Sequence, residues 1–172
     1  MNLSKVFIHK LESKDWAIFQ NLRLEALSLH PESFGSSLKE ESALSLDEFR
    51  QRFTNCDLFG AFAGDALVGC AGFYIYPNLN MSHRGCIFSM YLKPSYRKQG
   101  IAHQLVHTII EQAKEHVIQI HLTVVTSNLS AIKLYERHGF YIYGTEPRSL
   151  KIGHQFYDEH FMVLKLSSLN TH

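Results

Sequence analysis

Two short segments carry residues whose types and spacing could bind an anion and move a proton. The first reads Y-L-K-P-S-Y-R-K-Q-G-I-A from Tyr91 and places Arg97 and Lys98 before Gly100, where a helix is predicted to begin. A helix N-terminus presents unpaired N–H groups and about half a positive charge, so anions bind there readily. Gly100 has no side chain and would let an anion approach these amides closely. The segment predicts a seat for a phosphorylated ligand, with an ordinary basic turn as the alternative.

The second segment follows the next predicted strand and reads T-S-N-L-S-A-I-K-L-Y-E-R-H-G-F from Thr126. The Asn128 amide can both donate and accept hydrogen bonds. Tyr135 comes seven residues later, and positions seven apart lie on one face of a helix, so both side chains can face one groove. The ordinary alternatives are a helix N-cap for Asn128 and an amphipathic core position for Tyr135.

The composition of the whole chain excludes several classes of protein. Its 172 residues suit one domain, 1–172, and a net charge of +1 argues against a nucleic-acid or polybasic membrane binder. The cysteines form no C-x-x-C pair, and H-Q-L-V-H from His103 lacks the glutamate of H-E-x-x-H, so we expect no metal and solvated surface histidines. No apolar run approaches the ~20 residues of a membrane span, and the first residues are too polar for a signal peptide. We therefore expect a cytoplasmic protein.

The elements that must position the two segments alternate between strands and helices. The patterns predict strands at 6–11, 57–63, 66–76, 86–92, 117–125, 140–144 and 155–166, with Gly64-Asp65 as a hairpin turn. They predict helices from Ser13 or Asp15 to His30, from the Ser45–Glu48 capping box, at 101–116 and at 128–138. Segments 31–37 and 77–83 are expected to be loops. This order mixes an antiparallel meander with β-α-β crossovers, so the predicted fold class is mixed α/β.

Both chemical segments resemble the signatures of the GCN5-related N-acetyltransferase (GNAT) superfamily. R-K-Q-G-I-A is similar to Gln/Arg-x-x-Gly-x-Gly/Ala, and N-L-S-A-I-K-L-Y-E-R-H-G-F is similar to N-x-x-A-x-x-x-Y-x-x-x-G-F. The order of elements fits the family from Val6 to Leu166. The resemblance implies an α+β fold with a mostly antiparallel twisted sheet, splayed central strands and helices on both faces. It also implies N-acetyltransferase activity with acetyl-CoA as donor and a primary amine as acceptor.

The resemblance further implies a role for each site residue. Tyr135 would be the general acid that protonates the departing CoA thiolate. The backbone of Met90, Tyr91 and Leu92 would pair with the pantetheine arm, and an N–H near Met90 or Tyr91 would stabilise the oxyanion. Asn128 and Ser130 would hydrogen-bond the arm or the acceptor. The pyrophosphate would bind the backbone amides of six consecutive residues: Arg97, Lys98, Gln99, Gly100, Ile101 and Ala102.

The sequence assigns no general base and leaves other functions open. Many relatives carry a glutamate on the strand equivalent to 86–92, and this chain has none there, so Glu25, Tyr74, His121 and an ordered water remain candidates. A CoA-binding regulatory or sensor module without turnover is one alternative function, and an α/β interaction protein with accidental motifs is another. The acceptor could be a polyamine, an amino acid, an antibiotic or a protein amine. Dimers are common in the family, so a homodimer is an open alternative.

Overall fold

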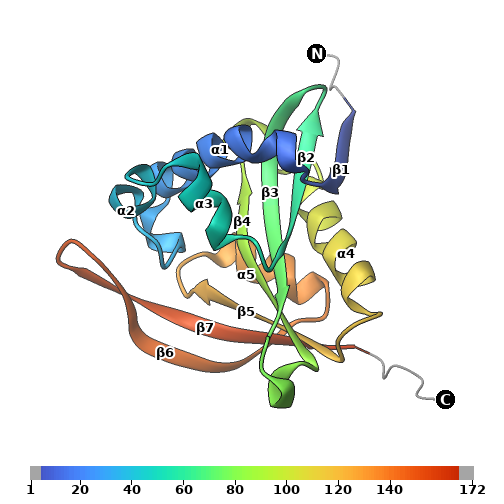
Figure 1. The fold of residues 1–172 in the computed structure, drawn as a ribbon. Coiled ribbons are helices and arrows are strands. Elements are labelled where there is room, and N and C mark those ends of the chain that lie inside the picture. Colours follow the sequence, from blue (N-terminus) through green and yellow to red (C-terminus); the bar gives the residue numbers. More distant parts are fainter. Residues whose placement is uncertain (1–4, 167–172) are drawn as a thin grey trace.

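One seven-stranded sheet runs through the computed structural model, which describes residues 5–166 (Figure 1). Residues 1–4 and 167–172 of the predicted domain lie outside this range. The strand order is β1-β2-β3-β4-β5-β7-β6, and every neighbouring pair is antiparallel except β4 with β5. The strands are β1 (Val6–Lys10), β2 (Asp57–Ala63), β3 (Ala66–Ile75), β4 (Arg84–Leu92), β5 (Gln119–Val125), β6 (Tyr141–Ile152) and β7 (Gln155–Lys165). The mixed α/β fold predicted from the sequence and the mostly antiparallel sheet that the resemblance implied are both confirmed.

Helices cover both faces of this sheet (Figure 1). They are α1 (Trp16–Leu29), α2 (Leu38–Ser42), α3 (Leu46–Arg52), α4 (Ile101–Ala113) and α5 (Leu129–Arg137). An apolar cluster that includes Phe19 and Phe49 joins α1 and α3 to one face. A second cluster joins α4 and α5 to the other face through residues such as Leu105 and Ile132. Each fully buried side chain of this kind stabilises the fold by roughly 1.5–3 kcal/mol, so both helical layers are fixed to the sheet.

The helical periodicity read from the sequence matches the packing of α4. All six of its predicted apolar positions are buried, and they are Ile101, Leu105, Val106, Ile109, Ile110 and Ala113. The helix ends at Ala113, three residues before the predicted end, and β5 begins at Gln119. No helix among residues 5–166 is long and apolar enough to cross a lipid bilayer.

Three features differ from the sequence-based expectation. Helix α2 was not predicted, although Ser37 and Glu40 form a capping box at its start. Asp15 precedes α1, but its carboxylate accepts from the Glu12 N–H at 2.8 Å and does not cap the helix. Strand β6 continues to Ile152, well past the predicted end at residue 144. A proline such as Pro147 normally indicates that a segment is not a strand. Here Pro147 lies where the β6–β7 register shifts, and an edge strand tolerates proline at such an irregularity.

Candidate active site

Strands β4 and β5 pair only over their first residues and then separate. Their parallel register contains Arg84, Gly85 and Cys86 of β4 and ends at the pair Cys86–His121. On its other edge β4 remains paired with β3 as far as Leu92. The later half of β4 therefore has an edge toward β5 without a strand partner, which is the splay that the resemblance implied. An extended ligand arm could add to this edge as a further strand would.

A β-bulge at Ser89 changes the direction of the backbone within this open edge. Ser89 has φ of 52°, a left-handed conformation, and the β3–β4 register shifts opposite it, between Cys70 and Gly72. Because of the extra residue, Phe88 and Tyr91 both face the α1 side of the sheet. The sequence did not predict this bulge, since serine has no strong preference for left-handed backbone and no glycine or asparagine marks the position.

Side chains of α1 hold the end of β4. The Tyr91 hydroxyl donates to Glu25 at 2.9 Å, and Glu25 also pairs with the Lys93 ammonium at 3.1 Å. Burial, together with the adjacent Glu25 carboxylate, raises the pKa of Tyr91 to about 12. Glu25, one of the candidate bases, is thus engaged in anchoring the strand.

The other two candidate bases differ in protonation. Burial raises the pKa of the Tyr74 hydroxyl far above its usual value, so Tyr74 keeps its proton at neutral pH. Burial lowers the pKa of His121, with Arg84 and His83 adding to the effect, so its imidazole favours the neutral form. The Nδ1 atom of His121 lies 3.3 Å from the Tyr143 hydroxyl. Its Nε2 atom is buried without a partner among the described residues. His121 is therefore the candidate whose charge state suits a base, although it sits where β4 and β5 are still paired.

The loop that enters α4 turns twice through left-handed backbone. Lys98 has φ of 62° and Gly100 has φ of 79°. Successive residues of alternating handedness make a concave arrangement of N–H groups that suits anions. Gly100 is the N-cap of α4, and no side-chain hydrogen bond caps the helix. A Cβ atom placed on Gly100 would meet no atom within 4 Å, so the space beside these amides is open to a ligand.

Arg97 and Lys98 contribute differently to this loop. The Arg97 Nε donates to the Leu92 carbonyl at 3.0 Å, and its Nη2 lies 2.9 Å from Nε2 of His30. Arg97 therefore ties the loop to the end of β4 and to the residue after α1. The Lys98 side chain is exposed. Because Arg97 is engaged within the protein and Lys98 is exposed, the backbone amides are the groups that this loop presents to a ligand in a fixed geometry.

Tyr135 lies in the same apolar cluster as the end of β4 and the start of α4. It is 5% exposed, and its ring meets Phe140 edge to face with centroids 5.7 Å apart. The cluster also holds Leu92 and Ile101. Burial, with a smaller contribution from Cys86, raises the pKa of the Tyr135 hydroxyl well above its usual range. The hydroxyl thus keeps its proton in neutral solution.

Asn128 caps α5, which is the ordinary role that its position suggested. Its Oδ1 accepts from the Ala131 N–H at 3.2 Å and from the Ser130 hydroxyl at 3.0 Å. The Nδ2 group of Asn128 takes part in neither bond. Ser130 is turned toward Asn128, so its hydroxyl proton is already used.

The histidines of α4 correct one expectation from the sequence. His107 is exposed as expected, but His103 is partly buried, and its Nδ1 lies 3.1 Å from Nε2 of His138. Burial lowers the pKa of His138, and the neighbouring histidines add to this effect. Over residues 5–166 there is no group of three side chains suited to bind a metal ion.

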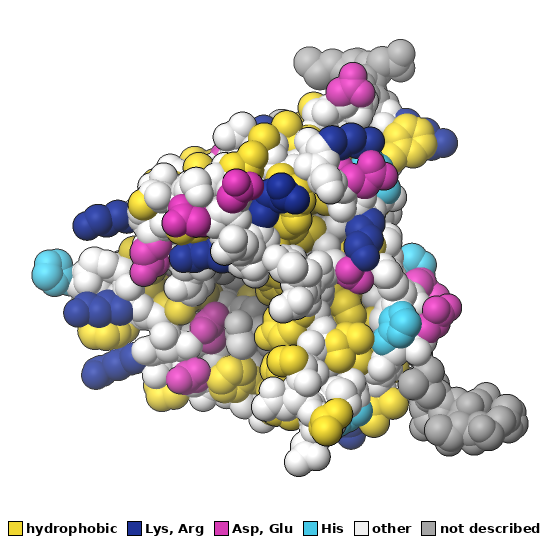
Figure 2. Space-filling model, viewed as in Figure 1, with side chains coloured by type: hydrophobic (Ala, Val, Ile, Leu, Met, Phe, Trp, Pro, Cys, Tyr) yellow, Lys and Arg dark blue, Asp and Glu magenta, His cyan; other side chains and the backbone are white. Residues whose placement is uncertain are grey.

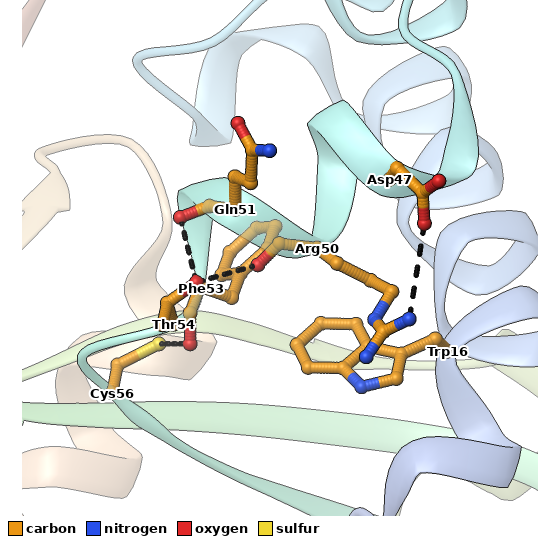
Figure 3. Close-up of a pocket in the computed structure, with 7 residues that line it drawn as sticks. All are labelled: Trp16, Asp47, Arg50, Gln51, Phe53, Thr54 and Cys56. Carbon is orange, nitrogen blue, oxygen red and sulfur yellow. Dashed lines mark hydrogen bonds and ion pairs between the residues drawn. The ribbon is translucent and has the colours of Figure 1, made fainter.

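A pocket of about 490 Å³ lies between α1 and α3, and none of its lining residues belongs to β4 or β5 (Figure 3). Arg50 lies beside Trp16 and pairs with Asp47 at 3.8 Å. None of the site residues predicted from the sequence lines this pocket.

On the face drawn in Figure 2, basic side chains are scattered among acidic and apolar ones and form no stripe of the kind that nucleic-acid binders show.

Comparison with known proteins gives one consistent result. Residues 18–140 match the model of the Acetyltransferase (GNAT) family. The chain is 30% identical over 132 residues to the uncharacterized N-acetyltransferase YsnE of Bacillus subtilis, covering 71% of this chain and 83% of that protein. It is 35% identical over 74 residues to N-alpha-acetyltransferase 30 of Saccharomyces cerevisiae, a match that spans 42% of each chain.

Solved structures share the fold over nearly the whole chain. A GNAT-family acetyltransferase from Streptococcus pneumoniae has a TM-score of 0.83 and 24% identity, covering 95% of this chain and 100% of that one. The yncA protein from Salmonella typhimurium, solved with its cofactor acetyl-CoA, has a TM-score of 0.82 and 17% identity, covering 98% of each chain. At these identities the likeness supports the fold.

Proposed function

Because the chain belongs to the Acetyltransferase (GNAT) family, it is an acetyltransferase, and we propose that it moves the acetyl group of acetyl-CoA directly to a primary amine. One observation carries the proposal. The open edge of β4 leads within eight residues to the N-terminus of α4, which no side chain caps, and Tyr135 shares one apolar cluster with Leu92 and Ile101. An extended amide-bearing arm and a pyrophosphate are joined in acetyl-CoA in the same order.

The residues present fit this donor. The amides around Gly100 face open space, and the helix dipole favours a negative charge there. The unpaired edge of β4 at Met90–Leu92 offers backbone groups to the pantetheine amides. Asn128 offers its Nδ2 group from the start of α5. Each of these contacts comes from a backbone or side-chain amide, so binding would require no charged side chain.

The chemistry needs three things from the protein. Attack of the amine on the thioester carbonyl places negative charge on the carbonyl oxygen, and the N–H group of Met90, just after the bulge at Ser89, would stabilise it. When the C–S bond breaks, the sulfur takes up a proton, which the protonated Tyr135 hydroxyl would donate. The attacking amine must first lose a proton, since a lysine-type amine has a pKa near ~10.4. His121 or a water molecule is left to accept that proton, because Glu25 is engaged by Tyr91 and Lys93.

Asn128→Asp separates the capping role of this residue from its binding role. Aspartate keeps the side-chain oxygen that caps α5, so we expect the free energy of unfolding to change by less than about 0.5 kcal/mol. It loses the Nδ2 donor and adds a negative charge near the arm, so acetyl-CoA should bind several-fold more weakly. Isothermal titration and chemical denaturation of the same preparation measure both quantities. Unchanged acetyl-CoA affinity would mean that Asn128 only caps α5 and does not bind the donor.

The experiment that tests the proposed function is acetyl transfer over a panel of amines. The panel should hold a polyamine, free amino acids, an aminoglycoside, and peptides with a free N-terminus or an internal lysine. We expect thiol release from acetyl-CoA that depends on one of these classes and yields the matching N-acetyl product. Tight binding of CoA without turnover on any amine would favour a sensor module. A melting temperature that CoA does not raise would contradict donor binding altogether.

A further inference from the structure

The guanidinium of Arg23 connects three separate parts of the chain inside the protein. From the middle of α1 its Nη2 and Nε donate to the Glu41 carboxylate of α2 at 2.9 and 3.0 Å. Its Nη1 donates to the Ser89 hydroxyl in the bulge of β4 at 3.0 Å. Arg23 is 6% exposed and Glu41 is 1% exposed. The Phe34 ring lies 4.7 Å from the guanidinium carbon and covers it.

Stability alone does not account for a buried pair of this kind. Removing two charges from water costs about as much as their attraction returns, and apolar side chains of similar size often stabilise a fold equally well. The planar fork of arginine, however, can hold a carboxylate with one edge and still donate to a third group, which the point charge of lysine does less well. Glu41 therefore fixes the guanidinium, and the remaining donor is directed at Ser89.

Ser89 is the residue whose conformation needs this support. A residue other than glycine with φ of 52° is strained, and such strain persists only where surrounding contacts fix it. Arg23 of α1 donates to the Ser89 hydroxyl, and the Cys70 thiol of β3 donates to the Ser89 carbonyl at 3.3 Å. The bulge is thus fixed on both the helix side and the sheet side. The next backbone N–H group belongs to Met90, in the part of β4 that has no strand partner toward β5.

We propose that Arg23, braced by Glu41, is a positioning residue for acetyl transfer, because its hydrogen bond to Ser89 sets the direction of the Met90 N–H group that would meet the thioester carbonyl. The inference rests on the proposed function, since it assumes that the acetyl group lies at the bulge. Arg23 itself would touch neither the donor nor the amine. Loss of the Arg23–Ser89 contact should therefore weaken the hydrogen bond to the acetyl carbonyl and lower turnover. It should not change the affinity for CoA, which has no acetyl carbonyl.

Ser89→Ala is the first variant to test, since it removes the contact and leaves Arg23 paired with Glu41. The measurement is the infrared carbonyl band of bound acetyl-CoA, isotope-labelled at the acetyl carbonyl. A hydrogen bond to the carbonyl lowers this frequency, so the band in Ser89→Ala should move back toward that of free acetyl-CoA. The preference for acetyl-CoA over CoA should fall while the affinity for CoA stays constant. Turnover should fall about 10- to 100-fold, the range expected when a catalytic donor is displaced by about an ångström.

A second variant and a control make the result specific. Arg23→Met combined with Glu41→Leu removes both charges together, so no unpaired charge is left buried, and it should shift the carbonyl band in the same way. Ser82→Ala removes an exposed hydroxyl that donates to the Leu79 carbonyl far from the bulge, and it should leave the band unchanged. A carbonyl band and turnover in Ser89→Ala equal to those of the wild type would overturn the positioning role. The band requires no amine, so a wild-type protein that acetylates no amine would contradict the proposed function while this measurement still decides the role of Arg23.

Discussion

Tyr135→Phe is expected to lower the turnover of acetyl transfer by about 10²- to 10⁴-fold, the usual contribution of a positioned general acid. The variant removes only the hydroxyl, and the ring keeps its place against Phe140. We therefore expect the affinity for acetyl-CoA to change little. Steady-state kinetics with saturating amine, beside titration calorimetry with acetyl-CoA, separates the two effects.

The pH dependence gives the same prediction a second test. Burial raises the pKa of Tyr135 above that of free tyrosine, so the acid form persists at every pH at which the donor is stable. Turnover should accordingly rise with pH as the amine loses its proton and should show no later fall due to Tyr135 below about pH 10. Tyr96→Phe is the matched control, because Tyr96 is partly buried against the same cluster. Wild-type turnover in Tyr135→Phe, or an equal loss in Tyr96→Phe, would contradict the assignment.

Gly100→Val is expected to weaken CoA binding more than Lys98→Ala does. Valine at φ of 79° is strained by roughly 1–3 kcal/mol, which corresponds to about 5- to 150-fold in affinity if the loop moves to relieve it. Lys98 is exposed, and a surface charge of this kind should contribute less than about fivefold. Titration of CoA with each variant checks this order, and a second titration at higher salt shows how much of the Lys98 contribution is electrostatic.

A second glycine with positive φ provides a matched control for the backbone strain that valine introduces at residue 100. Gly64 has φ of 60° in the β2–β3 turn, and a Cβ atom there would also meet nothing within 4 Å. Gly64→Val should lower the melting temperature about as much as Gly100→Val and should leave the affinity for CoA unchanged. A larger loss of CoA affinity in Lys98→Ala than in Gly100→Val would mean that the cations, and not the amides, bind the pyrophosphate.

The parts of the fold that the sequence predicted are those with local signals. The 3.6-residue spacing of Leu105 and Ile109 predicted the buried face of α4, and the Gly64-Asp65 pair predicted the hairpin between β2 and β3. The serine and glutamate of a capping box predicted α3, and the same pattern at Ser37 and Glu40 would have predicted α2. The prediction ended strand β6 too early, at residue 144. The remaining part of the strand is exposed, contains a proline and has no alternation of apolar and polar residues to mark it.

The site was predictable where it depends on short segments and was not where it depends on distant contacts. The turn before Gly100 and the cap at Asn128 follow from a few neighbouring residues. The bulge at Ser89 depends on Arg23, which lies 66 residues earlier in the chain, and the engagement of Glu25 depends on Tyr91. Contacts between residues this far apart in the chain produce no periodic pattern in a single sequence. From sequence alone, a buried arginine therefore cannot be told from an ordinary surface cation.

The measurement that tests the account most directly is a crystal structure of the protein with CoA bound. We expect the pantetheine arm along the open edge of β4 at Met90–Leu92 and the pyrophosphate on the amides around Gly100. We expect the sulfur within hydrogen-bonding distance of the Tyr135 hydroxyl. CoA bound elsewhere, for example in the pocket beside Trp16, or with its sulfur turned away from Tyr135, would contradict the account.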